Sequence, residues 1–119
     1  MMNTQEFINQ LNKAADSIEF SQTIETIESD YHYTPTRFTN GKGDHMAISE
    51  AGTNEGSCKI FAFAKLNALS EALTLQCFGD YYRVDVLQNP QGNDHANIRN
   101  FMLHGWDGIQ FDSEALSKK

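Results

Sequence analysis

The sequence predicts a mostly α-helical, compact multi-helix single domain, with a small extended or hairpin section near residues 31–49. Three observations lead to this prediction. Apolar residues recur at helical spacing along most of the chain, residues that favour helix starts precede several of these runs, and residues 31–38 instead gather aromatic and β-branched side chains around Pro35. Because no repeat or linker divides the sequence, residues 1–119 are expected to form one domain.

Two helices are expected before residue 31. Thr4 is expected to cap the first, whose apolar positions run from Phe7 to Ala15 at helical spacing. Ser17 or Ser21 is expected to begin the second, which closes with the acidic end Glu28-Ser29-Asp30. Negative charge at a helix C-terminus opposes the helix dipole, so the second helix is expected to stop early.

A turn and a glycine-rich loop follow the first extended residues. Residues 40–43 (Asn-Gly-Lys-Gly) are a strong turn signal, and residues 45–48 are expected to return as a short strand. Residues 51–56 are expected to form a glycine-rich loop. The run from Cys58 to Leu66 is apolar almost all round, which predicts a buried helix.

The next helix is expected to begin after the capping residue Ser70 and to run from Glu71 to about Leu87. Gly79 lies inside this helix. Glycine in a helix interior costs up to ~1 kcal/mol relative to alanine. Its presence therefore predicts close packing of another element at that point.

The C-terminal part is expected to begin with a break at residues 89–92 (Asn-Pro-Gln-Gly). Asn93 or Asp94 is then expected to cap a helix that ends at His104, with Gly105 in the left-handed conformation that commonly follows a helix. Beyond it we expect residues 109–111 to be extended and residues 112–116 to form a last helical turn.

Composition excludes several classes of partner. The chain carries 16 acidic and 9 basic residues, a formal net charge of −7, which opposes binding to nucleic acid or to an anionic membrane surface. No apolar run approaches the roughly 18 residues that span a bilayer, and the N-terminus lacks the pattern of a cleaved signal. Only two cysteines are present. These features are typical of a protein of the reducing cytoplasm.

Cys58 is the strongest candidate for a catalytic nucleophile. It follows Gly-Ser at a predicted helix start, where free N–H groups, the helix dipole and Lys59 would lower the pKa of the thiol. His95 as base and Asn97 as its orienting amide would complete the arrangement of papain-like hydrolases. The other interpretation is that Cys58 is a small buried hydrophobe, as free cysteines usually are. It is favoured because the surrounding signatures of such enzymes are missing, so no catalytic residue is assigned.

Metal and cofactor binding find no support in the residue pattern. The two Asp-His dipeptides at residues 44–45 and 94–95 are not a metal motif, because adjacent residues on a helix point about 100° apart. The sequence contains none of the established zinc, calcium or nucleotide-binding patterns. We therefore expect neither a metal site nor a cofactor.

Five residues are candidates for ligand binding. His95 and Arg99 are four residues apart, so on a helix they share a face, and with Tyr82 they could form a pocket for an acidic group. A solvated helix face is an equally good interpretation. Trp106 is expected to pack over the helix end, with an exposed aromatic anchor as the alternative. Asn54, in the glycine-rich loop, completes the set.

Taken together, these motifs resemble the HopJ type III effector family of bacterial proteins. The matching runs lie within residues 20–116: residues 34–36, 54–64, 78–83 and 95–102, and the Gly-Trp pair at 105–106. The resemblance implies one domain of this family but no particular reaction. It also implies either the bacterial cytoplasm or secretion into a host cell by the type III route.

We therefore expect an effector-like bacterial protein without assigned biochemical activity that acts by binding another protein, either a host or a bacterial one. Acidity and the content of Tyr, Trp and Arg are compatible with such a role. The alternatives are a thiol-dependent hydrolase or transferase that uses Cys58 and His95, and a protein with a pocket for small anions.

Overall fold

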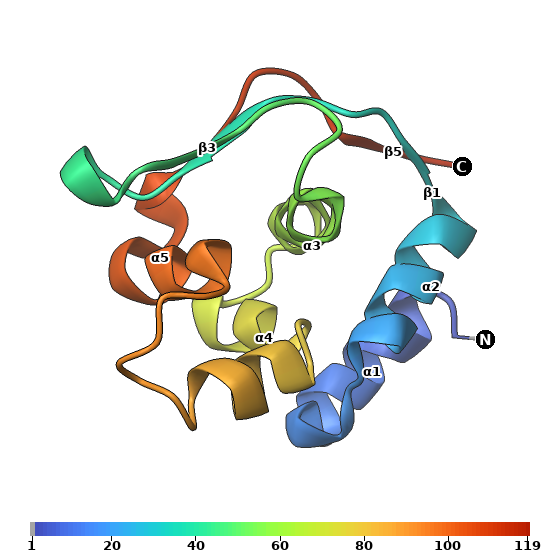
Figure 1. Cartoon of the computed structure of the whole chain (residues 1–119). Coiled ribbons are helices and arrows are strands. Elements are labelled where there is room, and N and C mark those ends of the chain that lie inside the picture. Colours follow the sequence, from blue (N-terminus) through green and yellow to red (C-terminus); the bar gives the residue numbers. More distant parts are fainter. Residues whose placement is uncertain (1) are drawn as a thin grey trace.

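Short strands arch over a group of helices in the computed structural model, which describes residues 2–119 (Figure 1). The helices are α1 (Thr4–Lys13), α2 (Phe20–Asp30), α3 (Glu55–Leu66), α4 (Glu71–Gln76) and α5 (Ala96–His104), with the π-helical segment η3 (Tyr81–Val86) and the 3-10 turns η1 (Ala15–Ser17), η2 (Gly43–His45) and η4 (Gly105–Gly108). The strands are β1 (Tyr31–Tyr33), β2 (Phe38–Asn40), β3 (Ala47–Ser49), β4 (Ile109–Phe111) and β5 (Leu116–Lys118). The predicted fold class, mostly helical with minor β-structure, is confirmed.

The strands form two small antiparallel sheets. One pairs β1 with β5, and the other has the order β3-β2-β4, with Phe38 of β2 opposite Ser49 and Phe111. The predicted hairpin and the extended residues 109–111 are thus confirmed. The predicted last helical turn is wrong. Leu116 is 1% exposed and begins β5, because pairing with β1 buries its side chain and satisfies its backbone.

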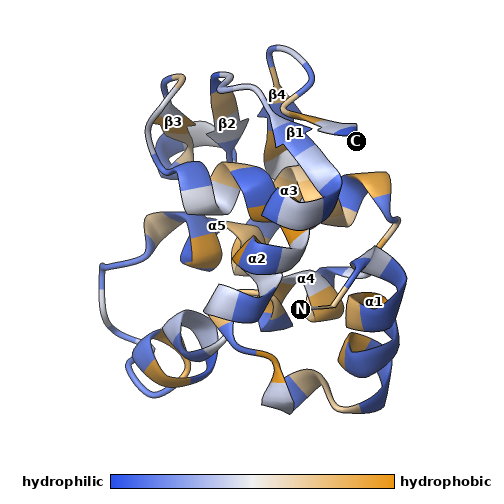
Figure 2. Cartoon of the chain, turned by 90° about the vertical axis from the view of Figure 1, so that its right-hand side faces the viewer, coloured by the Kyte–Doolittle hydropathy of each residue, from blue (hydrophilic) through white to orange (hydrophobic). Residues whose placement is uncertain are grey.

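Helix α3 lies at the centre, under the strands and between the other helices (Figure 1). The predicted buried helix is confirmed, because Phe61 is fully buried and its ring lies 5.0 Å from that of Phe101 and 5.5 Å from that of Phe78. Hydrophilic and hydrophobic residues alternate along the outer helices α1 and α2 (Figure 2), as in amphipathic helices. Among the described residues 2–119, no helix is long and apolar enough to cross a membrane.

The first two helices differ from the prediction at their ends. Asn3, not Thr4, caps α1, and α2 begins after Glu19 and not at either predicted serine. The expected early stop of α2 is also wrong. Both the N–H and the hydroxyl of Thr4 donate to the Asp30 carboxylate, at 2.7 and 2.6 Å, so the acidic end of α2 is stabilised by the start of α1.

The predicted helix over residues 71–87 is interrupted. Gly79 has a φ of +62°, which ends α4, and the chain resumes as the π-helical segment η3. The predicted close packing at Gly79 is confirmed, since a Cβ atom there would lie 2.6 Å from the backbone nitrogen of Phe20. The glycine therefore admits the start of α2 and cannot lie in a continuous helix.

Helix α5 begins one or two residues later than predicted. Its N-cap is His95, with a left-handed backbone at φ 51°, and neither Asn93 nor Asp94 caps it. Gly105 follows the helix with a positive φ of 59°, although its ψ of −151° lies outside the left-handed helical region. The helix and its glycine stop were thus predictable, but the unusual cap was not.

Candidate functional site

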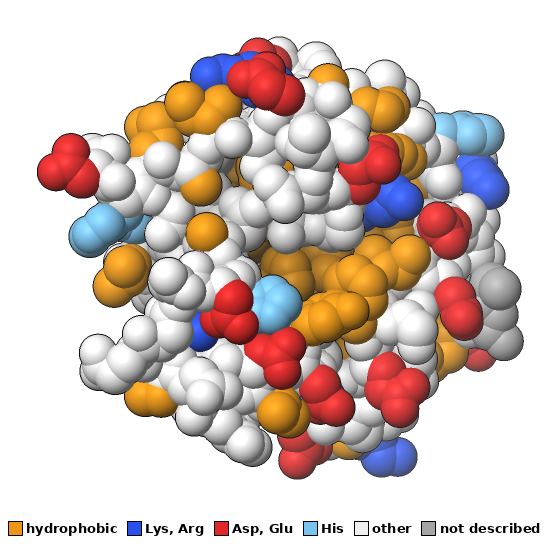
Figure 3. Space-filling view, viewed as in Figure 1, with side chains coloured by type: hydrophobic (Ala, Val, Ile, Leu, Met, Phe, Trp, Pro, Cys, Tyr) orange, Lys and Arg blue, Asp and Glu red, His pale blue; other side chains and the backbone are white. Residues whose placement is uncertain are grey.

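A pocket of about 410 Å³ lies where α3 and α5 both begin. Figure 3 shows a hollow on this face, with hydrophobic side chains at its base and a histidine and acidic side chains at its rim. The lining residues come from both helix starts (Asn54, Gly56 and Ser57; His95, Ala96, Asn97 and Ile98), from an apolar wall (Phe20, Phe78 and Tyr81) and from β3 (Ala47, Ile48 and Ser49). The pocket unites three predicted site residues, Asn54, His95 and Asn97.

Both helices start in the same unusual way. Asn54 and His95 have left-handed backbones, with φ of 49° and 51°, and neither side chain accepts a hydrogen bond from the helix that it precedes. The first backbone bonds of the helices come from Cys58 to the Asn54 carbonyl and from Arg99 to the His95 carbonyl. The earlier N–H groups of each first turn therefore lack an intrahelical acceptor.

Two buried side chains in the pocket have unused donors. Ser49 is 2% exposed, and its hydroxyl accepts a bond of 3.0 Å from the Asn54 amide but donates to no group among residues 2–119. Asn97 is 8% exposed, and its carbonyl oxygens accept from the Asn40 amide at 2.8 and 2.9 Å. Its own Nδ2 donates to nothing within the described chain. Both side chains are nonetheless hydrogen-bonded within the protein, and neither donor is among the buried side-chain atoms without a partner in the described chain.

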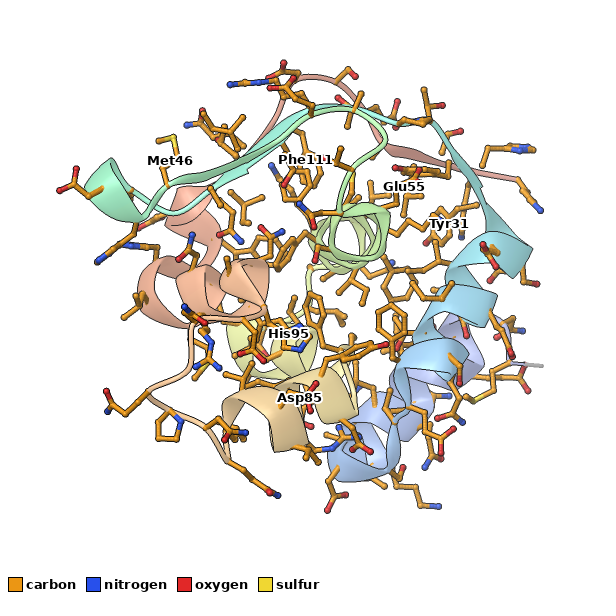
Figure 4. The ribbon with its side chains drawn as sticks, in the orientation of Figure 1. Tyr31, Met46, Glu55, Asp85, His95 and Phe111 are labelled. Carbon is orange, nitrogen blue, oxygen red and sulfur yellow. The ribbon has the colours of Figure 1, made fainter. Side chains whose placement is uncertain are left out.

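His95 lies on the rim beside Asp85, as Figure 4 shows. Its Nε2 is 3.0 Å from a carboxylate oxygen of Asp85, and its ring centroid is 5.3 Å from that of Tyr81. The orienting partner of His95 is thus a carboxylate and not Asn97, whose oxygens are held by Asn40. The proposed His–Asn pairing is wrong because these two side chains bond to different partners.

Cys58 does not lie in this pocket. It occupies the fourth position of α3 rather than the helix start, and its N–H is already bonded to the Asn54 carbonyl. The side chain is 1% exposed, and burial raises the pKa of its thiol, the reverse of the expected lowering. Burial likewise raises the pKa of Cys77 to about 12. This geometry favours the interpretation of Cys58 as a buried hydrophobe and does not bring it to His95.

The hydrogen bonds of Arg99 indicate a structural role. Its guanidinium lies 2.6 Å from the Asp94 carboxylate and 3.0 Å from the Asn89 carbonyl, and its Nε donates to the Asp94 carbonyl. The hydrogen bond from Arg99 lowers the pKa of Asp94. Arg99 thus fastens the loop before α5 and lies outside the pocket that His95 lines. The predicted grouping of Arg99 with His95 around one anion is therefore not what the structure shows.

The other two predicted binding residues also lie elsewhere. Tyr82 packs against the hydrophobic core and does not line the pocket. Trp106 packs edge-on against Phe101, with ring centroids 5.0 Å apart, and its Nε1 donates to the Leu69 carbonyl at 3.3 Å. Trp106 therefore covers the end of α5, as predicted.

A second surface feature is an apolar groove beside α5, which we call the α5 groove. It has a volume of about 300 Å³ and is lined by Val86, Leu87, Pro90, Gly92, Arg99, Met102 and Leu103. Leu103 is 66% exposed, Leu87 47% and Met102 45%. Such a gathering of exposed apolar side chains is typical of a binding surface.

Sequence patterns alone revealed neither surface fully. The groove had one signal, since Phe101, Met102 and Leu103 are consecutive and a helix turns about 100° per residue, so all three cannot face the core. The pocket donors Ser49 and Ser57 carry no signal of their own. In the described part of the chain, no cluster of three or more His, Cys, Asp or Glu residues could hold a metal ion.

Comparisons with known proteins agree with the earlier resemblance and extend it. The family model described as "HopJ type III effector protein" matches residues 4–116, which adds the first helix. A crystal structure of the "unknown function protein VPA0580" is 51% identical, with a TM-score of 0.94, and the match covers 99% of this chain and 95% of that chain. A search of curated proteins finds no match.

Proposed function

Since the chain belongs to the HopJ type III effector family, we propose that it is an effector-like domain that acts by binding another protein and not by catalysis. The exposed α5 groove is the observation that carries this proposal. The partner would be a protein of the bacterial cytoplasm or, after type III secretion, of a host cell. The family description supports a partner in a host cell. The α5 groove would bind a protein partner equally well in either location.

The groove suits an amphipathic helix that combines apolar and basic residues. Leu103, Leu87 and Met102 each leave about half or more of the side chain in water. Covering the rest would contribute roughly 1 kcal/mol for each, as burial of a whole Leu or Met side chain contributes about 1.5–3 kcal/mol. The charge of Arg99 in the groove is neutralised by Asp94. The electrostatic field around the groove is therefore set by the net charge of the chain, −7, which attracts Lys and Arg side chains of a partner.

A labelled amphipathic peptide of Leu and Lys, about 15 residues or four helical turns long, tests this proposal by fluorescence polarisation. We expect saturable binding that weakens with added salt. Leu103→Ser should weaken it about tenfold, which equals ~1.4 kcal/mol. Leu66→Ser is the matched control, because Leu66 is 55% exposed but lies outside the groove. Its affinity should equal that of the wild type.

Three results would contradict the proposal. Equal losses in the Leu103 and Leu66 variants would mean that the groove is not the binding surface. Equally tight binding of a matched Leu and Glu peptide would exclude a basic partner. A dimer that Leu103→Ser dissociates, measured by light scattering, would assign the groove to a second copy of this chain.

Cysteine labelling tests the alternative of a thiol-dependent hydrolase or transferase. Because Cys58 and Cys77 are buried and burial raises the pKa of both thiols, we expect neither to react with iodoacetamide in the folded protein at neutral pH. Both should react after unfolding in guanidinium, as read by mass spectrometry. Rapid labelling of Cys58 alone in the folded protein would restore the thiol mechanism.

A further inference from the structure

The strand β3 (Ala47–Ser49) is an edge of its sheet. It pairs with β2 on one side, and no other strand of residues 2–119 pairs with its outer side. Figure 2 shows β3 at the end of the row, with β2 beside it. An edge strand presents backbone N–H and C=O groups with which another extended segment can pair. This edge lies outside the α5 groove, so an inference from it goes beyond the proposed function.

The hydrogen bonds on the other side of β2 show how its backbone is oriented. The Gly41 N–H donates to the Gly108 carbonyl at 3.0 Å. At the other end of the strand, the Asp112 N–H donates to the Arg37 carbonyl at 3.0 Å. Successive residues of a strand direct their backbone groups to opposite sides. The odd-numbered residues 37, 39 and 41 therefore face β4, and the even-numbered residues 38 and 40 face β3.

This orientation fixes which residue of β3 faces outward. Phe38 lies opposite Ser49, and Asn40 lies opposite Ala47, so Ser49 and Ala47 direct their backbone groups to β2. The N–H and C=O of Ile48, which lies between them, point away from β2. Neither group bonds to another backbone group or side chain among residues 2–119. Ile48 thus presents one donor and one acceptor to an incoming strand.

The same edge borders the pocket between α3 and α5. All three residues of β3 line this pocket, together with the apolar wall of Phe20, Phe78 and Tyr81. The rings of Phe20 and Tyr81 meet edge to face with centroids 5.0 Å apart, and Tyr81 is 45% exposed. The wall therefore offers an apolar surface to a side chain from a segment that lies along β3.

The pleat of the sheet determines which side chains of such a segment reach the pocket. Ser49 is buried and Ala47 is half-buried, whereas Ile48 is 54% exposed, so Ile48 alone faces solvent. In a segment paired with β3, the residue opposite Ile48 would face solvent in the same way, and its two neighbours would face the helices. Large apolar side chains at these two neighbouring positions therefore suit the pocket.

Charge favours basic residues at the ends of the segment. The described lining of the pocket contains no Lys or Arg, and Asp85 lies at its rim. An adjoining hollow shares part of the apolar wall and is also lined by Glu19, Asp80 and Asp85. Together with the net charge of −7, these carboxylates attract Lys and Arg side chains of a partner.

We infer that β3 binds an extended segment of a partner protein, which adds a strand to this edge. The segment has large apolar residues on both sides of the residue opposite Ile48 and basic residues at its ends. Antiparallel pairing forms two hydrogen bonds with Ile48, one in each direction. Main-chain bonds of this kind supply affinity, and alternate side chains supply specificity. Because very short edge strands resist indiscriminate pairing, the apolar contacts in the pocket select the segment.

An acetylated and amidated pentapeptide, Lys-Phe-Val-Phe-Lys, tests the inference by ¹H–¹⁵N NMR. Its Val stands opposite Ile48, and both Phe side chains face the pocket. We expect saturable shifts of the backbone amides of Ile48 and Tyr81. The same peptide with an N-methylated Val cannot donate to the Ile48 carbonyl. It should bind about tenfold more weakly, which is the upper end of the range for one hydrogen bond. A peptide with Glu in place of both Lys should also bind more weakly.

Ile48→Pro tests the same pairing from the side of the protein. It removes the outward N–H but no bond to β2, and proline is tolerated at edge positions of this kind, which thermal melting checks. Affinity for the pentapeptide should fall about tenfold. Ile48→Ala keeps the N–H and is the matched control. Its affinity should stay within about threefold of the wild type, because a cross-strand side-chain pair contributes less.

Four results would overturn the inference. The first is the absence of saturable shifts with the pentapeptide, and the second is equal affinity for the N-methylated peptide, which requires no variant. The third is an equal loss of affinity in Ile48→Pro and Ile48→Ala. The fourth is a dimer of the protein alone that Ile48→Pro dissociates, measured by light scattering, which would assign the edge to a second copy of this chain.

The edge and the α5 groove can be tested separately. Leu103→Ser should leave binding of the pentapeptide unchanged, because Leu103 lines only the groove. Ile48→Pro should leave binding of the Leu and Lys peptide to the groove unchanged. Failure of the pentapeptide to bind would therefore overturn the inference about β3 while the proposed role of the groove stood.

Discussion

The helix starts of this molecule fall into two groups. At α1 the Asn3 side chain accepts from the Glu6 N–H at 2.9 Å, and at α4 the Ser70 hydroxyl accepts from the Leu73 N–H at 3.2 Å. A capping box closes the start of α2 as well. At α3 and α5 the N-cap backbones are left-handed, and within the described chain their side chains make no capping bond.

The difference lies in what the N-cap side chains do. The Asn54 amide bonds to Ser49, and the His95 ring bonds to Asp85, so both are directed away from the helix that they precede. The capped starts satisfy their own N–H groups, whereas the two uncapped starts leave theirs facing one pocket. Local side-chain caps therefore stabilise the starts of α1, α2 and α4, whereas the N-cap side chains of α3 and α5 stabilise other parts of the fold.

Crowding the capped start of α2 should have the largest effect. In Gly79→Ala the new Cβ would lie 2.6 Å from the Phe20 nitrogen at a residue with positive φ. We expect the free energy of unfolding to fall by about 3 kcal/mol, which combines ~1–2 for the backbone with ~1–3 for overpacking. Guanidinium unfolding measures it. Gly52→Ala is the control, since its φ is +87° but its Cβ would meet no atom within 4 Å, so it should lose only ~1 kcal/mol.

The uncapped start of α5 should depend on Asn40. This fully buried side chain donates to both carbonyl oxygens of Asn97 and so ties α5 to β2. Asn40→Ala should lower the free energy of unfolding by about 2 kcal/mol, because it leaves buried acceptors unsatisfied. A loss below ~0.5 kcal/mol would show that these two hydrogen bonds contribute little to holding α5 against β2.

Removing hydroxyls from the two groups of helix starts should give different results. Ser70→Ala removes a capping bond and should cost about 1 kcal/mol, or ~4 °C in the melting temperature. Ser57→Ala removes a hydroxyl that caps nothing, so its melting temperature should stay within ~2 °C of the wild type. Calorimetry of both variants tests whether the capped and uncapped helix starts differ in this way. Equal losses would mean that Ser57 stabilises its helix after all.

Asp30 should give the smallest effect and one that depends on pH. The side-chain and backbone hydrogen bonds from Thr4 lower the pKa of this carboxyl. The ionised form is therefore favoured in the folded state, and its contribution is present above the ordinary pKa of Asp and is lost as the pH falls through the lowered value. Asp30→Asn should thus be less stable than the wild type at neutral pH, and the difference should vanish in acid. A difference independent of pH would exclude this charge effect.

Several features could be predicted from the sequence because neighbouring residues determine them. The buried helix from Cys58 to Leu66, the turn at residues 40–43 and the glycine after α5 all follow from periodicity and local backbone preference. The close packing at Gly79 was also predictable, but the break in the helix at this residue was not. His95, Asn97 and Asn54 were each singled out from the sequence, but their meeting in one pocket was not predicted.

Only the tertiary structure decided the rest. The pocket brings Ser49 and Asn54 together with Asn97, which lies much further along the chain, and the helix starts that line it present backbone N–H groups, which every residue except proline possesses. The N-cap residues Asn54 and His95 bond to side chains five and ten residues earlier, Ser49 and Asp85, and β5 depends on a distant partner strand at residues 31–33. The sequence by itself determined that the chain is a mostly helical domain with a buried α3. Which helix starts remain uncapped was decided by the folding of the segments before them, because there the side chains of Asn54 and His95 bond to Ser49 and Asp85 and not to their own helices.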